Sequence, residues 1–146
     1  MSHTATSHRP ADAGQALLSV RGLNAWYGES HALHGVDLDI ASGETITLIG
    51  RNGVGKTTTL RAIMGIIPKR TGTIRFDGRD MMPVPLHRTA HHGIGFVPEE
   101  RGIFASLTVE ENLTLPPVVG KGGMTLDEIY DLFPVSYTHL TLPTTP

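Results

Sequence analysis

The chain has 146 residues, of which 39% are hydrophobic and 18% charged, and its formal net charge is −2. This length suits one domain with its own core, and the charge balance excludes the basic excess that recommends a nucleic-acid partner. The absence of cysteine excludes disulfides and thiolate metal sites.

The N-terminal residues 1–14 are polar and rich in His, Ser, Thr and Ala. They lack the apolar central segment of a secretion signal, so we expect a disordered lead-in. No stretch approaches the roughly 18 to 20 apolar residues that cross a bilayer. We therefore expect a soluble protein whose role at any membrane comes through a partner.

Three strands are predicted in the first third of the chain. Ala16–Tyr27 alternates weakly between apolar and polar residues, and Leu33–Ile40 places its apolar residues largely at a spacing of two. A turn is expected at 41–43. The run Thr45–Ile49 that follows is short, apolar and β-branched, which is typical of a buried strand in a parallel sheet.

A helix and a hairpin are predicted next. Apolar residues at helical spacing indicate a helix over Lys56–Ile67, which Pro68 stops. The Asp77-Gly78 pair after the apolar run Ile74–Phe76 favours a hairpin turn.

The last predicted elements complete an alternation of strands and helices. A short helix over Leu86–His92 should lead into a strand at Gly93–Val97, and helices are expected at Thr108–Leu115 and Thr125–Phe133. Each of these two helices opens with a Thr and has a Glu three residues later, the pattern of a capping box. Such an alternation around an early antiparallel section predicts an α/β domain.

One glycine-rich segment carries the chemistry. It has the pattern of Gly, four residues, then Gly-Lys-Thr, which is the phosphate-binding loop. Its glycines let the backbone turn N–H groups inward as an anion nest at a helix N-terminus. The predicted nucleotide-binding residues are Gly50, Arg51, Asn52, Gly53, Val54, Gly55, Lys56, Thr57 and Thr58.

Three side chains of this loop have predicted roles. Lys56 can reach the β- and γ-phosphates as a point charge, the Thr57 hydroxyl is placed to ligate Mg²⁺, and Thr58 can help hold the α-phosphate. A chance glycine-rich turn is the alternative, but the loop follows an apolar strand and opens an apolar-faced helix. The loop indicates nucleotide binding without separating transporters from kinases or GTPases.

Residues on either side of the loop carry a resemblance to the ATP-binding-cassette (ABC) transporter ATPases. Tyr27-Gly28, followed by His31–Val36, is similar to the opening of that family. The resemblance implies ATP as the nucleotide and implies that Tyr27 stacks on adenine, because a flat ring stacks on any base. The alternative for Tyr27 is a strand-end aromatic that packs on the core.

The segment Gly93–Glu99 resembles the Q-loop of the family, where a strand ends in Pro-Gln. The resemblance implies that the residue after Pro98 contacts Mg²⁺ and the attacking water, and that its loop meets the membrane subunit. Glu99 stands in place of the glutamine; a carboxylate can still ligate Mg²⁺, but it lacks the amide's hydrogen-bonding role. We therefore expect Lys56 and Glu99 as catalytic residues, and Thr57 and Glu99 at the metal.

The most specific stretch runs from Glu99 to Leu113. Glu99–Phe104 and Leu107–Leu113, together with the phosphate loop and Leu60–Gly65, resemble the second ATPase subunit of branched-chain amino acid importers. Urea-uptake ATPases are close relatives and remain an alternative. The resemblance covers about 17–134 and implies an α/β, P-loop NTPase fold: an ABC ATPase core with an N-terminal antiparallel β-subdomain.

Two groups of side chains can be explained without a role in binding or catalysis. The first is a charged cluster that could be only solvated surface; it consists of Glu99, Glu100, Arg101, Glu110 and Glu111. Five histidines build no recognisable metal site and are taken as structural or surface residues; they are His31, His34, His87, His91 and His92.

The resemblance also implies parts that this sequence does not contain. A complete ATPase of the family has a Leu-Ser-Gly-Gly signature, an apolar strand that ends in Asp-Glu, and a switch histidine after these. We therefore expect a C-terminally truncated, incomplete domain over 15–134. Residues 135–146 have no charged residue and resemble translated sequencing-adapter read-through, and we expect this tail to be artefactual.

For the intact parent, the resemblance implies an ATPase that drives branched-chain amino acid uptake. It would act as a dimer with a second ABC ATPase subunit and with integral-membrane permease subunits, in the cytoplasm on the inner face of the bacterial membrane. The alternatives are a catalytically incomplete nucleotide-binding fragment, a small-molecule kinase, and a DNA- or RNA-binding module. The last lacks a basic face, so no nucleic-acid partner is expected.

Overall fold

The chain divides after Thr89 into two units, each considered by itself below. The structure is a computed structural model that describes residues 16–100 and 102–134. The lead-in predicted for 1–14, the tail predicted for 135–146 and Arg101 therefore lie outside the described residues.

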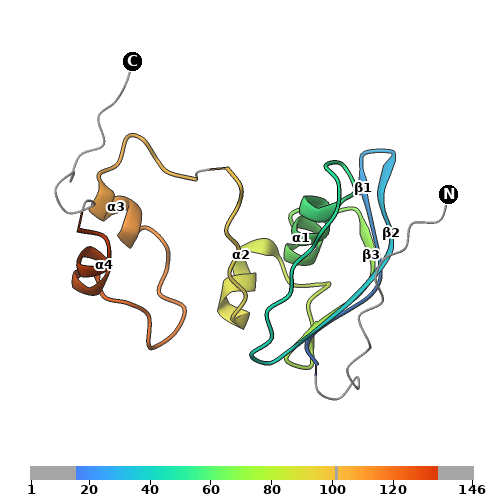
Figure 1. Cartoon of the computed structure of the whole chain (residues 1–146), viewed down its shortest axis with the longest axis horizontal. Coiled ribbons are helices and arrows are strands. Elements are labelled where there is room, and N and C mark those ends of the chain that lie inside the picture. Colours follow the sequence, from blue (N-terminus) through green and yellow to red (C-terminus); the bar gives the residue numbers. More distant parts are fainter. Residues whose placement is uncertain (1–15, 101, 135–146) are drawn as a thin grey trace. The chain divides into compact units, whose positions relative to one another are not determined.

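The first unit is built on a four-stranded antiparallel sheet (Figure 1). Its strands are β1 (Ala16–Tyr27), β2 (Ser30–Ala41), β3 (Arg70–Phe76) and β4 (Arg79–Asp80), in the order β2-β1-β3-β4. Both long strands predicted from the alternation of apolar residues are confirmed, and β2 is longer at each end than predicted. The antiparallel section expected at the start of the chain is therefore present.

The β3–β4 hairpin confirms the prediction from the Asp77-Gly78 pair. Phe76 pairs with Arg79, so the turn has two residues. Asp77 has φ 47° and Gly78 has φ 75°. Two positive φ angles in a two-residue loop give the mirror-image turn that matches the twist of the strands.

One helix, α1 (Lys56–Met64), packs against the sheet of the first unit (Figure 1). Apolar side chains of the helix and the sheet form the core, since Leu23 and Ile74 are 0% exposed and Ile63 is 7% exposed. The helix ends earlier than the predicted Ile67. Gly65 has φ 80° and terminates it, because glycine adopts this left-handed conformation without steric cost.

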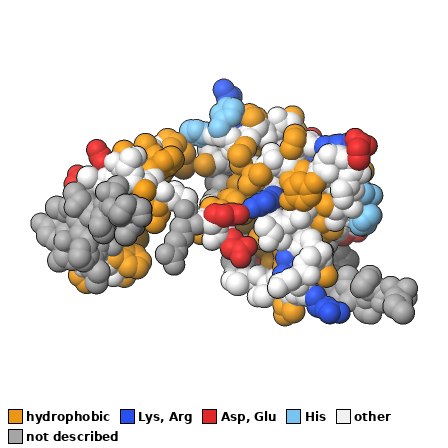
Figure 2. Space-filling view, turned by 90° about the horizontal axis from the view of Figure 1, so that it is seen from above, with side chains coloured by type: hydrophobic (Ala, Val, Ile, Leu, Met, Phe, Trp, Pro, Cys, Tyr) orange, Lys and Arg blue, Asp and Glu red, His pale blue; other side chains and the backbone are white. Residues whose placement is uncertain are grey.

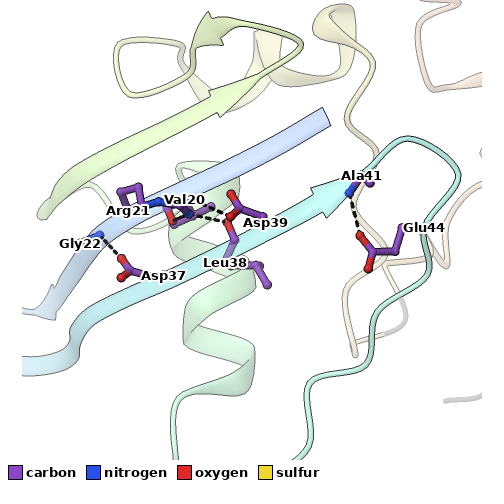
Figure 3. Close-up of polar contacts among 8 residues, drawn as sticks. All are labelled: Val20, Arg21, Gly22, Asp37, Leu38, Asp39, Ala41 and Glu44. Carbon is purple, nitrogen blue, oxygen red and sulfur yellow. Dashed lines mark hydrogen bonds and ion pairs between the residues drawn. The ribbon is translucent and has the colours of Figure 1, made fainter. Parts of the chain in front are cut away.

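Polar contacts join β1 to β2 around Arg21 and Gly22 (Figure 3). The backbone N–H of Gly22 donates to the carboxylate of Asp37 at 2.7 Å, and Arg21 pairs with Asp39. At the end of β2, the Ala41 N–H donates to Glu44 at 2.7 Å. The last bond closes the turn at 42–43, which confirms the turn predicted there.

The strand predicted at Thr45–Ile49 is wrong. Residues 44–50 form no strand, and Ile49 is 91% exposed. A parallel strand exists only when a neighbour supplies its hydrogen-bond partners. In residues 16–100 and 102–134, the strands pair only with one another and in antiparallel fashion, so this run stays extended without a ladder.

The short helix predicted at Leu86–His92 is confirmed in two parts. Residues Leu86–Thr89 form α2 at the end of the first unit. Residues Ala90–His92 form the 3₁₀ helix η1 at the start of the second. The strand predicted at Gly93–Val97 is wrong for the same reason as the one before the phosphate loop: these residues form no strand, and Val97 is 93% exposed.

The second unit also contains α3 (Val109–Thr114) and α4 (Leu126–Leu132). Both predicted capping boxes are present: in each, the Thr hydroxyl accepts the N–H of the Glu three residues on, and that Glu accepts the Thr N–H. The side chain of Asn112 also fixes the chain before α3. Its amide oxygen accepts the Phe104 N–H, and its amide nitrogen donates to the carbonyls of Phe104 and Thr108. Local hydrogen bonds thus define this unit.

Candidate nucleotide-binding site

The phosphate loop, residues 50–58, leads directly into α1. Gly53 has φ 86° and Gly55, the residue before the helix, has φ 96°. Gly50 makes a close approach, because a Cβ there would lie 2.8 Å from the Cγ2 of Val54. The glycines are therefore needed for the path of the loop, as the sequence predicted.

The N-terminus of α1 differs from those of α3 and α4. Gly55 provides no side-chain cap, and the first turn of α1 contains no acidic residue. The other two helices have a capping Thr and two acidic residues in the same place. A helix start with uncapped N–H groups and no nearby carboxylate attracts an anion.

The side chain of Lys56 folds back onto the first residues of the phosphate loop. Its ammonium group donates to the carbonyl of Gly50 and, at 2.9 Å, to the carbonyl of Arg51. An ammonium has three N–H donors, so a third can meet an acceptor in the loop. The Lys56 ammonium thus places a positive charge beside the loop N–H groups that form the anion nest.

The threonines after Lys56 separate into two kinds. Thr59 is buried and its hydroxyl donates to the Gly55 carbonyl at 2.7 Å, which fastens the first turn of α1. Thr57 is exposed and Thr58 half-buried. The exposed hydroxyl of Thr57 is an oxygen ligand of the kind that Mg²⁺ accepts.

Tyr27 lies beside the loop, although it comes from the end of β1. Its hydroxyl is 3.5 Å from the hydroxyl of Thr58, and the residue is 47% exposed. A core-packing aromatic would be buried, so the exposure favours the stacking interpretation. The structure brings Tyr27 and residues 50–58 together within one unit.

Glu99 is exposed and belongs to the second unit, so its predicted role at the metal stays a prediction. Glu111, another member of the charged cluster, caps a helix and is not merely a solvated side chain. Hydrogen bonds from the backbone and side chain of Thr108 hold the pKa of its carboxyl below the usual value. In the described residues, no group of three or more His, Asp or Glu side chains could hold a metal ion.

Sequence reasoning missed two basic residues of the α1–β3 connection. Lys69 donates to the Gly28 carbonyl next to Tyr27 at 3.1 Å. Arg70 donates to the carbonyls of Ala62, Ile63 and Met82, and burial lowers its pKa. The available signal was a basic pair just after a helix, which is a common partner of C-terminal carbonyls.

On the face shown in Figure 2, basic and acidic side chains lie interspersed, without an extended patch of one sign. None of the helices among the described residues is long and apolar enough to cross a bilayer.

The fold and the loop together define a nucleotide-binding domain of the phosphate-loop class. The sequence profile described as ABC transporter matches residues 33–142, which is more than half of the chain. The chain therefore belongs to the ABC transporter family, as the resemblance at Tyr27 and the phosphate loop indicated.

The curated relatives that the chain matches are ATP-binding proteins named for different transport systems. The chain is 42% identical over 106 residues to a probable ABC transporter ATP-binding protein of Azorhizobium caulinodans, covering 73% of this chain and 37% of the relative. It is 35% identical over 127 residues to the high-affinity branched-chain amino acid transport ATP-binding protein BraG of Pseudomonas aeruginosa, covering 81% and 52%. It is 41% identical over 98 residues to the lipopolysaccharide export system ATP-binding protein LptB of Escherichia coli, covering 67% and 41%.

Solved structures agree with the assignment. The structure of an ATP-binding subunit of an ABC transporter superposes with a TM-score of 0.72 at 27% identity, over 89% of this chain and 55% of that one. A nucleotide-free ATP-binding cassette from an ABC transporter gives 0.63 at 26% identity, over 80% and 46%. The chain thus spans between 37% and 55% of the length of the relatives named here.

Proposed function

We propose that this chain binds ATP with Mg²⁺ and forms the nucleotide-binding part of the ATPase subunit of an ABC importer. One observation carries the proposal: the uncapped start of α1, with Lys56 across the loop and Tyr27 beside Thr58, forms a site for a triphosphate with an adjoining base. The triphosphate would lie on the loop N–H groups. Adenine would stack on the Tyr27 ring.

The exposed Thr57 hydroxyl at the start of α1 fits Mg²⁺ bound together with the nucleotide. Thr57 would contribute this hydroxyl and the phosphates would supply further oxygens, while the expected role of Glu99 as a second protein ligand remains a separate prediction. The metal neutralises charge on the phosphates during phosphoryl transfer. Lys56 would hold the β- and γ-phosphates in place, and Gly50 and Arg51 hold Lys56.

We further propose ATP hydrolysis by a dimer with a second ATPase subunit, bound to membrane permease subunits through the Glu99 region. This would place it in the cytoplasm at the inner face of the bacterial membrane. Branched-chain amino acids are the proposed cargo, because the match to BraG extends over 127 residues and 52% of that relative. The expected domain limits of 15–134 belong to the same proposal.

A second cargo has its own support. The match to LptB is shorter, at 98 residues, but its identity is higher at 41%. Export of lipopolysaccharide is therefore the alternative to amino-acid uptake. The loop and Tyr27 serve either cargo, since the nucleotide site does not contact it.

The two cargoes can be separated with chimeras. Residues 16–134 would replace the matching part of BraG in one chimera and of LptB in the other, each in a strain without the native subunit. We expect the BraG chimera to restore leucine uptake and the LptB chimera to fail in lipopolysaccharide export. The reverse result would assign the export function.

The nucleotide site is tested directly by calorimetric titration of the whole chain with Mg-ATP. We expect saturable binding at one site. A chain that is folded by circular dichroism and yet binds no Mg-ATP would overturn the proposed function.

A further inference from the structure

The turn between β1 and β2 carries the proposed adenine platform, and Lys69 holds this turn. Tyr27 pairs with Ser30 across the turn, and Gly28 has φ 58°. The ammonium of Lys69 donates to the Gly28 carbonyl at 3.1 Å and lies 3.5 Å from the carboxylate of Glu29. The turn is thus attached to a segment more than thirty residues further along the chain.

The backbone of Lys69 makes a second attachment. The Trp26 N–H donates to the Lys69 carbonyl at 2.9 Å. The residues on both sides of Tyr27 are therefore bonded to the same lysine. The contact with Glu29 adds little, because this carboxylate is 99% exposed and exposed ion pairs are weak. The bond to the Gly28 carbonyl and the backbone bond from Trp26 are the two attachments that remain.

Arg70 connects the same segment to the other half of the site. Its guanidinium bonds the carbonyls of Ala62 and Ile63 at the end of α1, and α1 begins at the phosphate loop. Two consecutive residues thus hold the turn with Tyr27 and the helix with Lys56. The connection at residues 69–70 thus contacts both the turn that carries Tyr27 and the helix that follows the phosphate loop.

We propose that Lys69 is a positioning residue that holds the Tyr27 turn at the distance from the phosphate loop that adenine requires, and so sets the preference for ATP over a triphosphate without a base. The inference rests on the proposed function, because it needs adenine on Tyr27. Lys69 itself need not touch the nucleotide. The positively charged Nζ is a stronger donor to the turn carbonyl than a neutral group would be.

The test compares two ligands on the whole chain by calorimetric titration: Mg-ATP and Mg-tripolyphosphate. We expect Lys69→Met to raise the Kd for Mg-ATP about 3- to 10-fold, the loss of one hydrogen bond, with the Kd for Mg-tripolyphosphate unchanged. Lys69→Arg should keep the wild-type ratio of the two Kd values. Lys121→Met, an exposed lysine of the second unit, is the matched control and should change neither Kd.

Coupling to Tyr27 separates positioning from general stability. In the Tyr27→Ala background, Lys69→Met should add no further loss of ATP affinity, because no platform remains to be positioned. A merely structural role would add its cost in both backgrounds and for both ligands. If Lys69→Met does not fold, Lys69→Gln takes its place, with the same selective loss expected.

The outcomes are distinct. A wild-type chain that binds neither ligand overturns the proposed function and the inference with it. A wild-type chain that binds both, combined with a Lys69→Met variant in which the ratio of Kd values is unchanged, overturns the inference and leaves the nucleotide site standing.

Discussion

The guanidinium of Arg21 lies 2.5 Å from the carboxylate of Asp39 and joins the two longest strands of the sheet (Figure 3). The two side chains differ in environment: that of Asp39 is 5% exposed and that of Arg21 is 41% exposed. The hydrogen bond to Asp39 raises the pKa of Arg21. The buried carboxylate of Asp39 therefore has a charged partner that lies partly in solvent.

This pair predicts a large effect of a substitution at a partly exposed residue. Arg21→Met should lower the free energy of unfolding in urea by about 1.5–3 kcal/mol, the range for a hydrogen bond to a charged group. Arg75→Met is the matched control. Its guanidinium donates to the Gly78 carbonyl of the β3–β4 turn at 3.3 Å, on the surface. Its loss should cost at most about 0.5 kcal/mol. Equal losses in the two variants would contradict the assigned role of Arg21.

Lys56→Ala should weaken the binding of Mg-ATP about 10- to 100-fold, because it removes a charged donor to the phosphates. Under the proposed function the same change should sharply reduce ATP hydrolysis. Titration calorimetry measures the first effect and phosphate release the second. Since the Lys56 side chain also bonds the loop carbonyls, circular dichroism of the variant is the control for folding. Unchanged binding would contradict the phosphate-loop assignment.

Tyr27→Ala should raise the Kd for Mg-ATP about 5- to 100-fold, the range for the loss of one base–aromatic stack. Under the proposed function it should affect the affinity for ATP more than the turnover at saturation. Tyr27→Phe keeps the ring and loses only the hydroxyl, which lies 3.5 Å from Thr58, so this variant should bind nearly as well as the wild type. Equal affinity of the Ala variant and the wild type would favour core packing.

Acid should loosen the starts of α3 and α4. The bonds from Thr108 hold the pKa of Glu111 below its ordinary 4.5, and those from Thr125 do the same for Glu128. A carboxyl whose pKa is lowered by folding stabilises the folded state above its unfolded pKa, and this contribution is lost as the pH falls through the folded pKa.

The variant with both Glu111→Gln and Glu128→Gln keeps the capping geometry without the titration. We expect its helical signal in circular dichroism to match the wild type near neutral pH and to fall less as the pH drops below about 4.5. If the helical signal of the two proteins falls identically as the pH drops, the two capping carboxylates are not the cause of the acid sensitivity.

The features that could be predicted from the sequence are those that neighbouring residues determine. The Asp77-Gly78 turn, the two Thr–Glu capping boxes and the glycines of the phosphate loop need only a few residues each. The resemblance to the ABC family is confirmed, whereas the cargo and the role of Glu99 stay predictions.

The errors concern contacts between distant residues. The runs 45–49 and 93–97 have the composition of parallel strands, but composition cannot supply a neighbouring strand. Likewise, nothing near Lys69 in the sequence indicates that it reaches Gly28, 41 residues away. The predicted C-terminal end of α1 is also wrong, because Gly65 ends the helix three residues before Pro68.

The extended run before the phosphate loop has a consequence for how a ligand is bound. α1 holds the loop on one side, while residues 44–50 on the other side belong to no strand in the described part of the chain. Amide hydrogens without a ladder exchange rapidly with deuterated solvent. Binding at the loop should therefore slow exchange at 45–49, and part of the contact energy would be used to order this run. A nucleotide bound at the loop would thus also order the segment that precedes it.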